Sequence, residues 1–134
     1  MTIRNATSND LDIIAANDRW VSREVLLQKI FDNQVYVVYD NNEFAGWLRY
    51  GLFWDNTPFM NMLHLPEQYR GKGVGKQLVD FWEREMKSKG YKVLLTSSAQ
   101  TESAQHFYTK LGYSAIGGFT LAPEPFEIMF AKFL

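Results

Sequence analysis

The chain has 134 residues, 46% of them hydrophobic and 16% aromatic, which fits one domain spanning residues 1–134 with a sizeable core and argues against two domains. Fourteen Lys and Arg residues nearly balance fifteen Asp and Glu residues, and the net charge of -1 gives no global basic field for binding nucleic acid. The absence of cysteine excludes disulfides, thiolate nucleophiles and cysteine metal ligands, and is typical of a reducing compartment.

The N-terminal stretch MTIRNATSND has no apolar signal region, and no run of apolar residues approaches the roughly 18 that a membrane helix needs. We therefore expect a soluble, cytoplasmic protein that does not enter a membrane.

The first half of the chain predicts a short strand around Ile3 and then two helices. The first helix is expected near residues 8–16, with Ser8 as its N-cap, and the second is REVLLQKIFDN, capped by Ser22. Three strands follow. VYVVY and EFAGWLRYGLFW are expected to form a hairpin around the turn DNNE, and FMNMLHL follows the turn DNTP and ends before Pro66.

The second half alternates helices and strands. Residues 74–89 predict a helix that ends at Gly90, and its apolar stripe consists of Leu78, Val79, Trp82 and Met86. YKVLLT predicts a strand, ESAQHFYTKL a helix, and YSAIG and FEIMFAKF two final strands. This order indicates crossover connections beside antiparallel hairpins.

The segment YRGKGVG, residues 69–75, precedes the helix expected at residue 74. A glycine-rich turn that enters a helix leaves backbone N–H groups unpaired at the positive end of the helix dipole, and glycines let a ligand approach closely. Arg70, Lys72 and Lys76 add positive charge, so the pattern predicts a polyphosphate site. The alternative is a tight turn with solvated cations.

Two other phosphate-binding loops are excluded by spacing. A Walker A loop ending at Gly75-Lys76 would need glycine where Arg70 stands and Ser or Thr where Gln77 stands. A dinucleotide-binding fingerprint counted from Gly71 would need glycine at position 76, which is lysine. The sequence therefore does not support ATP hydrolysis or hydride transfer.

The run LHLPEQYRGKGVGKQLV resembles the acyl-CoA loop of the GNAT acetyltransferase superfamily, whose Gln/Arg-x-x-Gly-x-Gly/Ala pattern is met by Arg70, Gly73 and Gly75. AQHFYTKLGY is similar to a second signature of the family, and the two signatures in the expected order are more specific than either alone. The resemblance spans about Val35 to Tyr113 and includes Gly46.

The resemblance implies a single-domain α/β fold of the α+β type. Its mixed, mostly antiparallel sheet would be splayed at the centre, with helices on both faces. It also implies that acetyl-CoA is the co-substrate, with its pantetheine arm on the backbone of two strand residues and its diphosphate on the loop. The implied coenzyme-binding residues are Leu63, Leu65, Arg70, Gly71, Lys72, Gly73, Val74, Gly75 and Lys76.

The resemblance also places Tyr108 near the thioester sulfur, where its hydroxyl would protonate the departing thiolate. The alternative for Tyr108 is a buried packing role. The chain departs from the family pattern at two places. Thr101 stands where an asparagine often contacts the coenzyme, and FMNMLHL lacks the glutamate that many relatives use as a base.

The implied reaction is direct attack of a primary amine on the thioester through a tetrahedral intermediate, in which N–H groups near Leu65 stabilise the oxyanion. The proton acceptor stays open between water held by Asn61, His64 and Glu127. The acceptor amine is expected to be a small molecule or a peptide. Aromatic residues of WLRYGLFWDNTPF would line its pocket. Asp55, Glu124 or Glu127 nearby would suit a cationic amine, and Arg49 would equally suit a substrate carboxylate.

Two alternative functions stay open. The first is a noncatalytic acyl-CoA-binding sensor, and the second, which the sequence supports less well, is an ATP-binding module. With two histidines far apart and no cysteine, no metal site is expected. The expected partners include neither nucleic acid nor membrane, and the protein would be a monomer or a homodimer.

Overall fold

The computed structural model describes residues 1–134. Its strands are β1 (Thr2–Asn5), β2 (Val35–Asp40), β3 (Glu43–Phe53), β4 (Thr57–His64), β5 (Val93–Ala99), β6 (Ser114–Phe119) and β7 (Glu127–Phe133). Its α-helices are α1 (Leu11–Ala15), α2 (Arg23–Phe31), α3 (Val74–Ser88) and α4 (Ala104–Lys110). Two short 3-10 helices are η1 (Ser8–Asp10) and η2 (Glu67–Tyr69).

The strands are hydrogen-bonded in the order β1-β2-β3-β4-β5-β7-β6. β4 and β5, which are joined through α3, pair in parallel, whereas β1–β2, β2–β3, β5–β7 and β6–β7 pair antiparallel. The parallel pair has only two registered positions, Phe59 with Leu95 and Met60 with Thr96. The expected mixed, mostly antiparallel α/β fold is confirmed.

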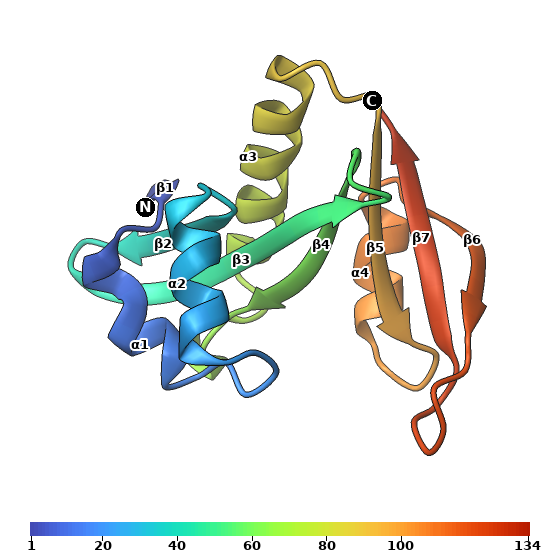
Figure 1. Ribbon diagram of the computed structural model, residues 1–134, viewed down its shortest axis with the longest axis horizontal. Helices are drawn as coiled ribbons and strands as arrows, with labels where there is room; N and C mark the ends of the chain where they lie inside the picture. The colour runs from blue at the N-terminus through green and yellow to red at the C-terminus, as the bar shows by residue number, and fades with distance from the viewer. The chain divides into compact units, whose positions relative to one another are not determined.

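The chain divides into two compact units, and each is described here by itself. Unit 1 comprises Met1–Tyr50 and Met62–Trp82, and unit 2 comprises Gly51–Asn61 and Glu83–Leu134. Figure 1 shows α1 and α2 beside β2 and β3 in unit 1, and β5, β7 and β6 side by side in unit 2. The single domain expected from the sequence remains a prediction.

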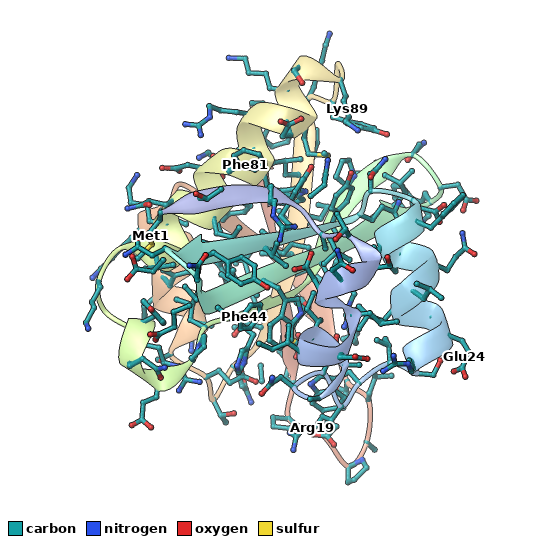
Figure 2. All side chains as sticks on the ribbon, turned by 90° about the vertical axis from the view of Figure 1, so that its left-hand side faces the viewer. Met1, Arg19, Glu24, Phe44, Phe81 and Lys89 are labelled. Carbon is teal, nitrogen blue, oxygen red and sulfur yellow. The ribbon has the colours of Figure 1, made fainter.

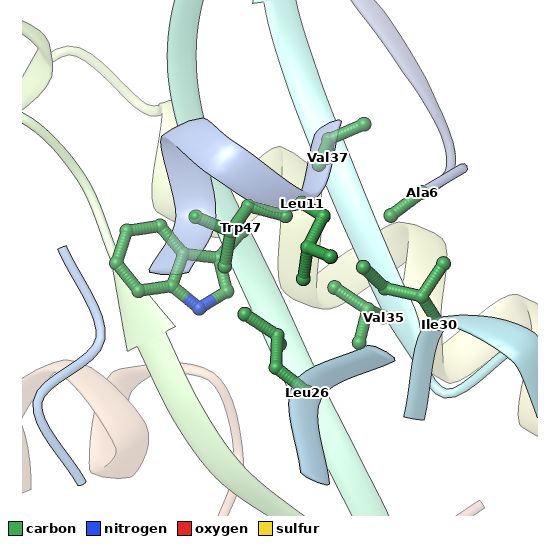
Figure 3. Packing of buried hydrophobic residues seen from close by; sticks show 8 residues of the cluster. Ala6, Leu11, Leu26, Ile30, Val35, Val37 and Trp47 are labelled. Atoms are coloured by element: carbon green, nitrogen blue, oxygen red, sulfur yellow. The ribbon is translucent and has the colours of Figure 1, made fainter. Parts of the chain in front are cut away.

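The core of unit 1 forms where α1 and α2 pack on one face of β2 and β3. Figure 3 shows the indole of Trp47 beside Leu11 and Leu26. The buried members of this cluster are Ala6, Leu11, Ile14, Leu26, Ile30, Val35, Val37 and Trp47. Because side chains alternate along a strand, Val35 and Val37 face these helices and Tyr36 faces the other side.

On that other side, α3 covers the strands of unit 1. The ring of Tyr36 meets Phe81 of α3 edge-on at 5.2 Å between centroids, and Tyr50 lies 5.9 Å from Trp82. Figure 2 labels Phe81 on α3 and Phe44 on β3, on the two sides of the strands. Helices therefore cover both faces of the sheet within unit 1, as expected.

The N-terminal turn of unit 1 corrects one sequence expectation, because the capping residue is Thr7 and not Ser8. The Thr7 side chain accepts a hydrogen bond from Asn9 N, and Asp10 Oδ2 accepts one from Thr7 N at 2.7 Å, which makes a capping box around η1. The Asp10 carboxylate also accepts hydrogen bonds from Arg4 at 2.8 Å and from the Tyr39 hydroxyl at 2.9 Å. It thereby joins β1, η1 and β2.

Unit 2 is built on β7, which pairs with β5 from Val93–Phe133 to Ala99–Glu127 and with β6 on its other edge. The C-terminal part of α3 is tied to this sheet through Glu83. Its carboxylate accepts hydrogen bonds from the Tyr113 hydroxyl at 2.8 Å and from Lys132 Nζ at 2.9 Å. The α4 helix contacts β5, and its Tyr108 ring lies 6.1 Å from that of Phe130 on β7.

Candidate active site

The glycine-rich turn of unit 1 has the backbone that the sequence predicts. Gly71 and Gly73 have φ angles of +72° and +82°, in the region that side-chain-bearing residues rarely adopt, and α3 begins at Val74. A Cβ added at either glycine would meet no heavy atom within 4 Å. The glycines are therefore required by backbone conformation and not by crowding within the chain.

Hydrogen bonds on the N-terminal side of the glycine-rich turn connect it to the rest of unit 1. Buried Tyr69, at the end of η2, donates a hydrogen bond from its hydroxyl to Asp40 Oδ2 at 3.4 Å. Arg70 Nε donates to the Leu65 carbonyl oxygen at 2.9 Å. These contacts fix the glycine turn relative to the ends of β2 and β4.

The three cations of the turn have different surroundings. Arg70 reaches back to Leu65, while Lys76 Nζ lies 2.7 Å from Asp80 Oδ2, one helical turn further along α3. The Lys76 side chain remains 62% exposed, and Lys72 is exposed as well. Because the Lys76–Asp80 pair is at the surface, it contributes little stability and leaves the ammonium accessible to an anion.

The end of β4 lies against β3 at Gly46, and this contact explains the glycine that the family resemblance singled out. A Cβ at Gly46 would stand 2.6 Å from the His64 carbonyl oxygen and 2.6 Å from Leu65 Cδ2. Gly46 also has a φ of +147° beside a register shift between Val38 and Tyr39. Leu63 lies within β4, whereas Leu65, expected in the strand, follows its last residue.

His64, one of the candidate proton acceptors, packs against β3. Its ring centroid is 4.5 Å from that of Trp47, and burial, together with the charge of Arg70, lowers its pKa below the ordinary value. Asn61 is an exposed residue of β4 in unit 2. Glu127, at the start of β7, accepts a 2.6 Å hydrogen bond from Ser97 Oγ.

Tyr108 is buried in unit 2 among aromatic rings. The ring centroids of Phe107 and Tyr113 lie 5.4 Å and 5.9 Å from its own. Burial raises the pKa of its hydroxyl to about 12, with a smaller opposing effect from a hydrogen bond with Thr96 and further increases from Glu102 and Glu127. The phenol therefore keeps its proton at neutral pH, as a general acid requires.

Part of the segment WLRYGLFWDNTPF, which was expected to line an acceptor pocket, is buried in the core. Trp47, Arg49 and Tyr50 are buried, whereas Trp54 is 79% exposed. The Arg49 guanidinium is paired with buried Asp18, a partner that the sequence reading missed. No local pattern marks Asp18, since the two residues are 31 positions apart. Arg49 therefore does not offer an uncompensated charge to a substrate carboxylate.

Unit 1 contains all the residues proposed to hold the coenzyme, namely Leu63, Leu65 and Arg70 to Lys76, and unit 2 contains Tyr108. Thr101 and His106 are exposed in unit 2, before and within α4. No group of three or more His, Cys, Asp or Glu side chains is arranged to hold a metal ion. None of the helices is both long and apolar enough to cross a membrane.

The model of the acetyltransferase (GNAT) family matches residues 8–113. The chain belongs to the GNAT family. This match includes the glycine turn, all of α3 and Tyr108, and it stops at Tyr113 before β6 and β7. No curated protein matches the chain significantly.

Three solved structures share this fold at low sequence identity. Ard1 from Thermoplasma volcanium is 13% identical with a TM-score of 0.85, and the match covers 99% of this chain and 97% of that one. The PaiA N-acetyltransferase from Thermoplasma acidophilum, solved with coenzyme A, is 21% identical with a TM-score of 0.83 over 99% and 98% of the two chains. A ribosomal-protein-alanine N-acetyltransferase from Brucella melitensis is 18% identical with a TM-score of 0.84 over the full length of both.

Proposed function

We propose that this GNAT protein transfers an acetyl group from acetyl-CoA to a primary amine. The observation that carries the proposal is the turn at Gly71 and Gly73, whose positive φ angles lead directly into the 15-residue helix α3. Such a turn presents backbone N–H groups at the positive end of a helix dipole, which suits a diphosphate. The PaiA structure, which contains coenzyme A, supports the choice of coenzyme.

In this proposal the loop from Arg70 to Lys76 binds the diphosphate, and the backbone of Leu63 and Leu65 binds the pantetheine arm. The amine nitrogen attacks the thioester carbon, N–H groups near Leu65 stabilise the oxyanion, and the carbon–sulfur bond then breaks. The Tyr108 hydroxyl gives its proton to the leaving thiolate, and the phenol is restored by the proton that the attacking nitrogen releases, carried through water. Its pKa of about 12 keeps that proton available over the whole neutral range.

The acceptor is proposed to be a small-molecule or peptide amine. The Brucella neighbour is described as acting on ribosomal-protein alanine, and another neighbour is a NatC complex bound to a Gag peptide. These descriptions favour including peptides with a free N-terminus in any screen. The Arg49–Asp18 pair gives no reason to favour acidic substrates.

A binding experiment tests whether acetyl-CoA is the coenzyme. Acetyl-CoA, coenzyme A and ATP are added separately, and the melting temperature of the protein is followed. At a hundredfold excess over the dissociation constant, a ligand that binds only the folded state stabilises it by about 2.7 kcal/mol. We expect acetyl-CoA and coenzyme A to stabilise the protein. An absence of any shift at millimolar acetyl-CoA contradicts the proposal, and a shift with ATP alone supports the nucleotide-binding alternative.

A turnover experiment separates an enzyme from a sensor. A panel of diamines, amino-acid amides and short peptides is offered with acetyl-CoA, and free thiol is measured with a thiol reagent. Because the protein has no cysteine, the reagent reports released coenzyme A without a contribution from the enzyme. Binding of acetyl-CoA without acceptor-dependent thiol release from any amine favours the acyl-CoA sensor.

A further inference from the structure

The chain just after β4 in unit 1 is held by an arginine side chain. Leu65 follows His64, the last residue of β4, and the next residue is Pro66, which has no backbone N–H to donate to a sheet. The Leu65 carbonyl oxygen accepts a hydrogen bond from Arg70 Nε at 2.9 Å. Arg70 therefore fixes the peptide group that joins Leu65 to Pro66.

The peptide group on the other side of Leu65 is fixed by β3. The His64 carbonyl oxygen lies so close to Gly46 that a Cβ there would stand 2.6 Å from it. The peptide bond between His64 and Leu65 is trans, and in a trans peptide the N–H points opposite to the carbonyl, so the Leu65 N–H is directed away from β3. The contacts at Gly46 and Arg70 together determine where this N–H points.

Arg70 keeps hydrogen-bond donors beyond the one that it uses on Leu65. A guanidinium has five N–H donors, and the four on the two Nη groups make no hydrogen bond or ion pair within the chain. The side chain is exposed, and Gly71 and Gly73, with their positive φ angles, follow it directly. Because the planar fork of an arginine suits two phosphate oxygens, one side chain can hold Leu65 and a diphosphate together.

We propose that Arg70 is a positioning residue, which holds the Leu65 carbonyl with Nε while its Nη groups bind the diphosphate of acetyl-CoA. This inference rests on the proposed function, in which an N–H group near Leu65 stabilises the oxyanion. The bound diphosphate orients the guanidinium, and the guanidinium orients the backbone of Leu65. The Leu65 N–H is then in place when negative charge develops on the thioester oxygen. No covalent bond changes at Arg70, and it keeps its protons.

Three substitutions separate the two contacts of Arg70. In Arg70→Gln the amide Nε2 occupies the same place along the side chain as the arginine Nε, so the donor to Leu65 is kept and the charge is lost. Arg70→Met has a methyl group at that place and loses both the donor and the charge. Arg70→Lys has a methylene group there and keeps its charge further along a flexible stem.

The two contacts should affect different measurements. A hydrogen bond that positions the oxyanion donor acts only in the transition state, so its loss lowers kcat. We expect Arg70→Met and Arg70→Lys to lower kcat about tenfold, and Arg70→Gln to keep kcat within about threefold. Calorimetry with coenzyme A should show the other ranking, since a charged donor binds phosphate more strongly. Arg70→Gln and Arg70→Met should weaken binding about tenfold, and Arg70→Lys by less than about threefold.

A donor without a diphosphate gives a second readout. With S-acetylpantetheine, Arg70→Gln should match the wild-type kcat/KM within about threefold, whereas Arg70→Met should remain about tenfold slower. Lys72→Gln is the matched control for charge, because Lys72 is an exposed cation of the same turn and makes no hydrogen bond or ion pair within the chain. It should weaken coenzyme A binding without the loss of kcat seen in Arg70→Met.

The melting temperature of each variant shows whether it is folded, as expected for substitutions of exposed side chains. A wild-type kcat in folded Arg70→Met overturns the inference. Equal losses of kcat in Arg70→Gln and Arg70→Lys do so as well, as does a tenfold loss in Lys72→Gln, because each attributes the effect to charge alone. If the wild-type protein transfers no acetyl group to any amine, the proposed function fails, and the inference fails with it.

Discussion

Arg49 Nε donates a hydrogen bond to Asp18 Oδ2 at 3.1 Å, and the two side chains are only 6% and 0% exposed. Removing one charge of a buried pair leaves the other without compensation in a poorly solvated site. We expect Asp18→Asn to lower the free energy of unfolding by about 3–5 kcal/mol, as measured by urea denaturation.

The surface pair between Arg23 and Asp12 supplies the control, because its side chains are 57% and 85% exposed. Asp12→Asn should change the free energy of unfolding by less than about 1 kcal/mol. Equal effects of Asp18→Asn and Asp12→Asn would show that burial does not distinguish the two ion pairs.

Gly73→Ala tests whether the glycine turn binds the coenzyme. The φ of +82° makes any side chain there unfavourable by about 1–2 kcal/mol, and a methyl group would also obstruct a diphosphate on the backbone. We expect affinity for acetyl-CoA, measured by calorimetry, to fall by roughly tenfold or more, since hydrogen bonds to a charged group are each worth about 1.5–3 kcal/mol.

Gly90→Ala controls for the backbone penalty of Gly73→Ala. Gly90 follows the C-terminus of α3 with a φ of +91°, and a Cβ there also meets no heavy atom within 4 Å. Both variants should lose similar stability, and only Gly73→Ala should lose affinity for acetyl-CoA. If Gly73→Ala and Gly90→Ala lose similar affinity for acetyl-CoA, the turn at Gly73 has a structural role only.

Tyr108→Phe removes the proposed acid and keeps the ring that packs on Phe107, Tyr113 and Phe130. Turnover should fall by roughly 10² or more, while affinity for acetyl-CoA should change little. Because the wild-type pKa is raised to about 12, the activity decline from loss of this proton should lie well above pH 10, the ordinary tyrosine value. The pH profile is measured with an amine whose chemical step is rate-limiting. Unchanged turnover with an unchanged alkaline limb would make Tyr108 a packing residue.

Asp10 should make the protein sensitive to acid. Burial opposes its ionisation, but hydrogen bonds from Arg4, Thr7 and Tyr39 together hold its pKa below the ordinary 3.8. A depressed carboxylate pKa contributes stability that is complete above the unfolded value and is lost as the pH falls through the folded value. The stability difference between wild type and Asp10→Asn, from urea denaturation, should therefore be constant from pH 7 to about 5 and shrink below about pH 4. A difference that does not change with pH would exclude this contribution.

Local signals predicted most of the elements correctly. Ser22 caps α2 by accepting a hydrogen bond from Val25 N, and Gly90 has a positive φ angle after α3. These features depend on a few neighbouring residues, so one sequence is enough to find them. The helix beginning at residue 74 was predicted for the same reason, because its apolar stripe repeats with the helical period.

The predictions that were wrong or missing concern features that depend on contacts between residues far apart in the chain. The choice of Thr7 over Ser8 as a cap depends on Asp10, which is held in place by Arg4 and Tyr39 from two strands. The strand predicted over residues 91–96 runs over Val93–Ala99, because β5 pairs with β7 along its whole length. The pairing of Asp18 with Arg49 joins residues far apart in the chain and leaves no local pattern.

Gly46 illustrates how such a contact constrains evolution of the sequence. Any Cβ at this position would stand 2.6 Å from the His64 carbonyl oxygen, which is a backbone atom and cannot be moved by a change of rotamer. In a saturation mutagenesis experiment, position 46 would tolerate substitution as poorly as a catalytic residue. The cause would be steric, and a directed-evolution library aimed at new acceptors should therefore keep this codon fixed.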